Sequence, residues 1–217
     1  MSDTVHMRVA SIPSPSVSAE APANGLYGAV AIGASAGGIA AMREILGALP
    51  ADFPLPILIV LHLSRTQPSR LAEVLGFCSK LPVKWAQNGE RALPGTVYVA
   101  PMDRHLLLSR NGRLALCDSD PAWWWRPAID KLFESVADSM GPRAIGVVLS
   151  GALWDGTAGI AAIRKGGGIT IAQDEIGCDH FDMPASAIDV GRVDIVRSPA
   201  KIAELLNVAG GLTGNLQ

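Results

Sequence analysis

The amino-acid sequence predicts an α/β fold: a doubly wound, mostly parallel sheet between two layers of helices, with an inserted β-hairpin region. Two observations favour this three-layer αβα class. Short apolar runs alternate along the chain with segments that have the apolar spacing of helices. The runs 55–61 and 144–149 are almost continuously apolar, as parallel strands covered on both faces require. The length of 217 residues and the hydrophobic content of 49% suit one domain with a well-buried core.

Each expected element has its own signal in the sequence. The run 29–32 is apolar and ends at a glycine, as in a buried strand, and the Ala, Met, Arg and Glu residues after the next turn favour a helix. A proline near its start favours a helix at 68–76, and apolar residues recur at helical spacing within 127–140. In chain order we expect strands at 29–32, 55–61, 144–149, 168–173 and 193–196, and helices at 39–46, 68–76, 127–140, 158–164, 184–190 and 199–208.

The segment 81–118 has a different pattern, with short β-like pieces in place of the α/β alternation. Asn111-Gly112 lies between two of these pieces and is a strong signal for a hairpin turn. We therefore expect a β excursion inserted into the α/β domain, not a second domain. The expected pieces are 83–85, 96–100, 106–108 and 114–116.

Composition indicates where the domain begins and ends. Residues 1–24 alternate Ser, Pro, Ala and Val without the apolar core of a secretory signal, so we expect a disordered tail. One domain then extends over 25–210, and 211–217 form a short C-terminal tail. No apolar run reaches the roughly 18 residues of a membrane-spanning helix, so membrane insertion is not expected.

Charge and cysteine content exclude several classes of partner. A formal net charge of −2 gives no basis for binding nucleic acid or an anionic membrane surface. The three cysteines have neither an even count nor CxxC spacing, which indicates a reduced, cytoplasmic compartment. The His, Cys and carboxylate positions show no ligand spacing, so we expect no metal and no organic cofactor.

The most informative motif is a strand-to-helix turn at 33–38, which holds a single serine, Ser35. The favoured interpretation is a nucleophile elbow, G-x-S-x-G, in which glycines permit a sharp turn and leave the serine hydroxyl exposed. The second is the dinucleotide fingerprint G-x-G-x-x-G, although Ser35 takes the place of its middle glycine and Asp52 lies ahead of the second strand, not at its end. A glycine-rich turn without chemistry is a third interpretation.

Ser35, His62 and Asp155 each follow an apolar strand, and ligands of parallel sheets bind outside the carboxyl ends of the strands. A nucleophilic serine needs a base for its proton, and the imidazole of that base needs a partner that fixes its tautomer. His62 has the position of such a base; the other histidines lie in the tail, at a hairpin strand and in a polar loop. Taken alone, Asp155 is more simply a helix N-cap or a turn residue ahead of Gly156.

Several motifs then occur in an order that is far more specific than any one of them. They are GASAGG, the strand end VLHLS, VYVAP with a later His105, RPAIDKLF, GVVLSGALWDG, and GGITIAQDE with a later MPASAI. From about residue 27 to 207 this series resembles the C-terminal domain of CheB, the chemotaxis protein-glutamate methylesterase. The resemblance implies a doubly wound α/β domain that hydrolyses γ-glutamyl methyl esters on cytoplasmic signalling helices of chemoreceptors and releases methanol. Some members of the family also deamidate glutamine there.

The resemblance also implies roles for individual residues. Ser35 would be the nucleophile, His62 the base and Asp155 the acid that orients the imidazole. Backbone N–H groups near Ala36 and Gly37 are the candidate oxyanion donors. The expected partner is a methyl-accepting chemoreceptor as protein substrate, and we expect the protein to be a monomer.

The sequence departs from the family pattern close to the expected site. Ala36 stands where the family typically has Thr, and the family segment G-M-G-x-D-G here has Ala152, Leu153 and Trp154 before the aspartate. Asp182 stands where Gly is usual. Members usually carry an N-terminal receiver domain, and here we expect only the short tail, so that control in cis would be missing. These departures affect the expected substrate specificity and leave the three catalytic candidates in place.

Tryptophan side chains are candidates for contact with the substrate, and ordinary packing is the alternative interpretation of each of them. Trp154 adds bulk next to the proposed aspartate, and we regard it as close to the substrate. The tryptophans 123–125 are consecutive and cannot all face one core, so at least one should be exposed or line a cleft. Two other classes of function stay open: a non-catalytic module that binds receptor helices, and a nucleotide-binding domain.

Overall fold

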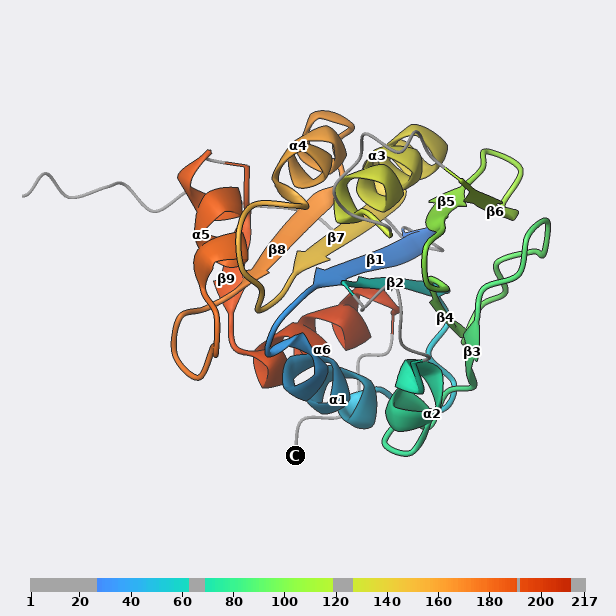
Figure 1. Cartoon of the computed structure of the whole chain (residues 1–217), viewed down its shortest axis with the longest axis horizontal. Helices are drawn as coiled ribbons and strands as arrows, with labels where there is room; N and C mark the ends of the chain where they lie inside the picture. Colours follow the sequence, from blue (N-terminus) through green and yellow to red (C-terminus); the bar gives the residue numbers. More distant parts are fainter. Residues whose placement is uncertain (1–26, 63–68, 119–126, 191, 212–217) are drawn as a thin grey trace, which may run out of the picture.

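The computed structural model describes residues 27–62, 69–118, 127–190 and 192–211. The expected N-terminal tail, the tryptophans 123–125 and residues 212–217 lie outside these ranges. Within the described residues, seven strands form one sheet and two more form a separate hairpin, with α-helices on both faces of the larger sheet (Figure 1). The expected three-layer αβα fold is confirmed.

The seven-stranded sheet is parallel throughout and has the order β3-β4-β2-β1-β7-β8-β9. The first strand of the sheet, β1, is its central strand; the sheet continues outward through β2 on one side and later through β7 on the other. A doubly wound sheet has its topological switch point between such strands, and ligands bind there. The strands are β1 (Ala29–Ala34), β2 (Ile57–Leu61), β3 (Val83–Trp85), β4 (Val97–Val99), β7 (Ala144–Val148), β8 (Ile169–Gln173) and β9 (Ile195–Arg197).

Helices bury both faces of this sheet. One face is covered by α1 (Gly38–Ala48), α2 (Leu71–Gly76) and α6 (Pro199–Ala209), and the other by α3 (Ile129–Met140), α4 (Thr157–Lys165) and α5 (Asp182–Asp189) (Figure 1). The 3₁₀-helix η1 (Gly141–Arg143) connects α3 to β7.

Side chains of β1 alternate between the two hydrophobic cores, as the pleat of a strand requires. Val30 and Ile32 pack with the core under α1 and α6, whereas Ala29 and Ala31 pack with the core under α3 and α4. The strand therefore has no face left for a polar residue, and this explains its continuous apolar sequence.

The central strands are aligned so that their carboxyl ends share one edge of the sheet. Ile32 of β1 is in register with Ile59 of β2 and with Val147 of β7. Hydrogen bonds continue past the strands, because the His62 N–H donates to the carbonyl of Ala34 over 3.2 Å. The residues that follow β1, β2 and β7 are thereby fixed next to one another.

The expectation of a β excursion over 81–118 was wrong for its first half. β3 and β4 belong to the main sheet, where β4 pairs in parallel with both β2 and β3. Only β5 (His105–Leu108) and β6 (Leu114–Cys117) form a separate antiparallel hairpin. The connection between β3 and β4, residues 86–96, contains no helix, although the connection between two parallel strands usually does.

Candidate active site

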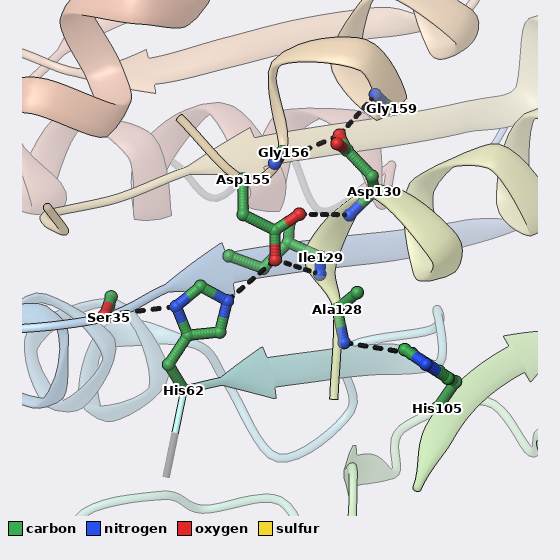
Figure 2. A network of polar contacts seen from close by, with 9 residues as sticks. All are labelled: Ser35, His62, His105, Ala128, Ile129, Asp130, Asp155, Gly156 and Gly159. Carbon is green, nitrogen blue, oxygen red and sulfur yellow. Dashed lines mark hydrogen bonds and ion pairs between the residues drawn. The ribbon is translucent and has the colours of Figure 1, made fainter. Parts of the chain in front are cut away.

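Ser35 lies at the first position after β1, immediately before the turn that starts α1. Its N–H donates to the carbonyl of Ser150 over 2.9 Å, and its own carbonyl accepts the N–H of Gly38 at 3.0 Å. These bonds hold the backbone of the serine between the ends of β1 and β7. The side chain is half-buried, and its hydroxyl points toward His62 (Figure 2).

Two glycines of the G-x-S-x-G motif are required for different physical reasons. Gly37 has a φ of 76°, in the left-handed region that favours glycine, and a Cβ there would lie 2.6 Å from Ser150 Oγ and from Asp179 Cβ. Gly33 is in regular β1, but a Cβ on it would lie 2.3 Å from Ile129. One glycine therefore makes the turn, and the other makes room for the start of α3.

His62 follows β2 and joins the serine to a carboxylate. Its Nδ1 is 3.2 Å from the Ser35 hydroxyl oxygen, and its Nε2 is 2.7 Å from Oδ2 of Asp155 (Figure 2). An ionised carboxylate only accepts hydrogen bonds, so Nε2 carries the hydrogen and Nδ1 is left to accept the serine proton. The imidazole side chain is 8% exposed.

Asp155 is buried, with 5% of its surface exposed, at the N-terminus of a helix that is not its own. Its Oδ2 accepts the N–H of Ile129 at 2.7 Å, and its Oδ1 accepts the N–H of Asp130 at 3.0 Å. These are free amides of the first turn of α3, where the helix dipole also favours a negative charge. The alternative expectation, that Asp155 is the N-cap of the helix that follows it, was wrong. The N-cap residue of α4 is Gly156, and no side chain caps this helix end through a hydrogen bond from the N-cap position.

Sequence reasoning missed Asp130, which lies in the first turn of α3 beside the triad candidates. Its Oδ1 accepts the N–H of Gly156 at 3.0 Å and that of Gly159 at 2.7 Å (Figure 2). The pKa of this carboxyl is raised from 3.8 to about 6, chiefly by burial. The nearby charges of Asp155 and Glu134 act in the same direction, and the hydrogen bonds from the two amides act in the opposite one. The available signal was an acidic residue in the first turn of an expected helix.

The other histidines of the described chain do not join this hydrogen-bonded series. His105 is fully buried in β5, and its Nδ1 accepts the N–H of Ala128 at 3.1 Å, just before α3. His180 is exposed, and its backbone N–H donates to Ser150 Oγ over 3.1 Å. His105 thus supports the helix whose N-terminus holds Asp155, whereas His6 lies outside the described residues.

The residues expected near the substrate lie on the solvent side of this edge. Ala36 is exposed, and so are Leu153 and Trp154, at 43% and 65%. Leu153 has a φ of 69°, a left-handed conformation that a branched side chain seldom adopts. The family pattern has glycine at this position, so the departure noticed in the sequence coincides with a strained backbone.

Among the described residues, no group of three or more His, Cys, Asp or Glu side chains is arranged to hold a metal ion. None of the described helices is long and apolar enough to cross a membrane.

A serine hydroxyl, an imidazole and a buried carboxylate joined by hydrogen bonds at one edge of an α/β sheet define the serine hydrolase class. The order of the residues along the chain is Ser, His, Asp, which differs from that of the α/β-hydrolases. The model of the CheB methylesterase family matches residues 30–206, and the chain belongs to this family.

The comparisons with known proteins agree on this family. A protein-glutamate methylesterase/protein-glutamine glutaminase of Photorhabdus laumondii is 42% identical over 178 residues, which are 81% of this chain and 51% of that protein. One from Geobacter metallireducens is 44% identical over 170 residues, 77% of this chain and 47% of the relative. The crystal structure of the Thermotoga maritima CheB methylesterase catalytic domain superposes with a TM-score of 0.79 at 39% identity, covering 83% of this chain and 97% of that one.

The chain spans about half the length of the curated relatives it matches. It corresponds to the whole of the solved catalytic domain. Family membership does not favour the nucleotide-binding interpretation of the glycine-rich turn.

Proposed function

We propose that this protein is a serine esterase that hydrolyses glutamyl methyl esters on the cytoplasmic helices of a chemoreceptor and releases methanol. The observation that carries the proposal is the hydrogen-bonded series from Ser35 through His62 to Asp155. Its support comes from relatives that are named protein-glutamate methylesterase. The reaction would take place in the cytoplasm, where such signalling helices lie.

In the first half of the reaction, the Ser35 oxygen attacks the ester carbonyl while Nδ1 of His62 accepts the hydroxyl proton. A C–O bond forms and the carbonyl becomes an oxyanion. The same proton then passes from His62 to the departing methoxide, which leaves as methanol, and a glutamyl ester of Ser35 remains. Asp155 holds the imidazole with its hydrogen on Nε2 and stabilises the positive charge that the ring gains.

The oxyanion needs donors that are in place before the reaction begins. The amide groups of Ala36 and Gly37 are suited to this task, because they lie between Ser35 and the N-terminus of α1, where the helix dipole favours negative charge. In the second half of the reaction, water gives a proton to His62 and attacks the acyl-enzyme. His62 then returns that proton to the Ser35 oxygen as the acyl C–O bond breaks, and the products are the free glutamate side chain and the regenerated Ser35 hydroxyl.

The same site suits a second leaving group. Both relatives are also named protein-glutamine glutaminase. With a glutamine side chain, ammonia leaves in place of methanol, and the acyl-enzyme and its hydrolysis are unchanged. We propose this deamidation as an additional activity of the Ser35 site.

The deciding experiment is methanol release from a methylated chemoreceptor by the parent protein and by Ser35→Ala. Loss of a triad nucleophile should lower the rate by roughly 10³ to 10⁶-fold, while circular dichroism shows a folded domain. Ser109→Ala, in the loop between β5 and β6, is the matched control and should keep the parental rate.

Covalent labelling with a fluorophosphonate separates the enzyme from a non-catalytic receptor-binding module. An activated Ser35 should be labelled in the parent protein and not in Ser35→Ala. A parent protein that binds the receptor but neither releases methanol nor reacts with the probe would be a binding module, and the esterase proposal would be wrong.

A further inference from the structure

Asp130 and Asp155 form a reciprocal pair, in which each carboxylate binds the N-terminus of the helix next to the other. Asp155 lies just before α4, yet it accepts the first amides of α3 at 2.7 and 3.0 Å. Asp130 lies in the first turn of α3, yet it accepts the amides of Gly156 and Gly159 around the start of α4, at 3.0 and 2.7 Å (Figure 2). Four charge-assisted hydrogen bonds therefore fasten the two helix ends to each other.

The close approach of α3 and α4 allows this exchange. A Cβ on Gly159 would lie 2.5 Å from Phe133 Cβ and 3.0 Å from the Cα of Asp130, so only glycine leaves the two backbones this near. The acceptor of the Gly156 amide is consequently a side chain from a different helix. Because Gly156 directly follows Asp155, the bond to Asp130 fixes the backbone that aims Asp155 at His62.

The loop before Asp155 needs such a constraint. Leu153 occupies a left-handed conformation, which stores strain in a non-glycine residue, and the next side chain, Trp154, is 65% exposed. Strained backbone persists only where the surrounding structure holds it. The hydrogen bond from the Gly156 N–H to Asp130 restrains this loop at its C-terminal end.

We propose that Asp130 is a positioning residue for the esterase reaction: its Oδ1 fixes the loop that carries Asp155, and its negative charge supports the protonated state of His62. This inference rests on the proposed function, because the reaction it serves is that of the Ser35 site. Asp130 acts through Asp155 and touches neither the serine nor the substrate.

Within the part of the chain that the structure describes, the charged groups that face Asp130 can be named. On α3 it is faced by Glu134, which contributes to raising its pKa and which pairs with Lys131 over 3.4 Å. From the loop before α4 it is faced by Asp155, and through that residue by His62. The first turn of α4, residues 157–160, carries no charge. With a pKa raised to about 6 by burial, Asp130 is ionised above that pH and adds its negative charge behind the Asp155–His62 pair.

Two substitutions separate the oxygen of Asp130 from its charge. Asp130→Asn keeps a carbonyl oxygen that can accept both amides and removes the charge, whereas Asp130→Ala removes both. Glu134→Gln is the matched control, because it neutralises a carboxylate on the same helix that pairs with Lys131. Each variant is assayed on p-nitrophenyl acetate from pH 5 to 9, with rates divided by the folded fraction.

For Asp130→Ala we expect kcat to fall about 10 to 100-fold with KM within about twofold, since a small misplacement of a catalytic group costs this much. For Asp130→Asn we expect kcat within about threefold of the parent. The acid limb of its pH profile should move to lower pH by about 0.3 to 1 unit, because protonated His62 has lost one attractive charge. Glu134→Gln should have the parental kcat and a smaller shift.

Thermal unfolding provides a readout that a purely structural residue would not give. Because the folded-state pKa of Asp130 is raised, its contribution to stability is largest at low pH and is lost as pH rises through about 6. The melting temperature of Asp130→Asn should therefore not fall below that of the parent above pH 7, even though its acid limb has moved. That of Asp130→Ala should fall at every pH, because two amides lose their acceptor.

Parental kcat per folded molecule in Asp130→Ala would overturn the inference, and so would an Asp130→Asn variant whose acid limb has not moved. If Asp130→Ala does not fold, the acid limb of Asp130→Asn alone decides. Failure of the proposed function is a separate result, visible as hydrolysis that does not depend on Ser35. In that case the proton resonance of His62 Nε2 decides the inference: a shift or broadening in Asp130→Ala supports it, and an unchanged resonance overturns it.

Discussion

Two strand-to-helix turns at the same edge of the sheet carry the two ends of the proposed triad, and they are built in different ways. The turn from β1 to α1 holds Ser35 and achieves its shape with Gly37, in the left-handed region. The turn from β7 to α4 holds Asp155 but places Leu153 in the left-handed region and an exposed Trp154 beside it. Both turns have a glycine with positive φ at the N-cap of the following helix, Gly37 before α1 and Gly156 before α4. The second turn also contains the left-handed Leu153, and hydrogen bonds to another helix hold it in place.

This difference teaches which part of the site is encoded locally. A glycine with positive φ specifies its turn within a few residues, without help from the rest of the chain. The turn of Asp155 depends on α3, because its amides and the side chain of Asp130 hold the loop from the opposite side. Substitutions in the two turns should therefore have different consequences.

The largest expected effect on activity comes from removing the His62 side chain, which joins the two turns through its hydrogen bonds to Ser35 and Asp155. His62 contacts both, so His62→Ala should lower ester hydrolysis by roughly 10³-fold or more, as for other triad members. His105→Ala should lower the melting temperature, because a buried imidazole and its bond to Ala128 are lost, but keep at least part of the activity per folded molecule. Steady-state rates with folded fractions check this, and an inactive, folded His105→Ala would show that the triad is assigned wrongly.

The pH dependence of ester hydrolysis by the parent protein also tests whether an imidazole is the base. Only neutral imidazole accepts the serine proton, so the rate should decrease as pH falls and His62 becomes protonated. A rate that stays constant through this range would exclude an imidazole base.

The local turn was the part of the site that could be predicted from the sequence. Ser35, His62 and Asp155 each follow an apolar run, and parallel strands bring their carboxyl ends to one edge, so adjacency followed from the fold class. The role of Asp130 could not be predicted in this way. An acid in the first turn of a helix is expected to interact with helix amides, but the sequence does not say that they belong to a helix 26 residues further on.

Most of the fold could also be predicted from local sequence patterns, and the prediction was wrong where strand pairing depends on distant parts of the chain. Buried strands separated by helices have distinct sequence periods, and the alternating parts of the chain were placed within a few residues. The short strands β3 and β4 have no helix between them, so their parallel pairing in the main sheet was not visible in the sequence. Pairing partners of such strands are set by the neighbouring β2 and by the cores on both faces.

A matched pair of substitutions, at the left-handed Gly37 of the first turn and the left-handed Leu153 of the second, tests the comparison directly. Gly37→Ala should destabilise the protein by about 2 kcal/mol or more, since positive φ costs a non-glycine residue ~1–2 kcal/mol and the new Cβ lies 2.6 Å from two neighbours. Leu153→Gly should stay within about 1 kcal/mol of the parent, because relief of strain offsets the entropy of glycine and the lost apolar contact. Chemical denaturation measures both values.

The same pair should differ in activity. Gly37→Ala displaces a candidate oxyanion donor and should lose about tenfold or more in kcat, whereas Leu153→Gly should retain most of it because Asp130 still holds the loop. Equal stability losses in the two variants would show that Leu153 is not strained, and the contrast between the turns would have to be given up.

The smallest expected effect concerns Trp154, the exposed tryptophan of the second turn. Because 65% of its surface is exposed, the Trp154 side chain packs little against the core. Trp154→Ala should therefore change the free energy of unfolding by only about 0.5 kcal/mol. An exposed tryptophan beside the proposed catalytic aspartate is suited to contact an apolar or helical substrate, and such a contact contributes about 1 kcal/mol or more.

We therefore expect Trp154→Ala to raise KM for a methylated receptor peptide about fivefold or more, as 1 kcal/mol implies, with kcat/KM for p-nitrophenyl acetate unchanged. A small ester does not extend to the tryptophan, so only the larger substrate should respond to its loss. Phe77→Ala, which removes an aromatic that is 87% exposed at the end of α2, is the control and should alter neither substrate. Equal losses on both substrates together with a lower melting temperature would mean that Trp154 stabilises the fold and does not select the substrate.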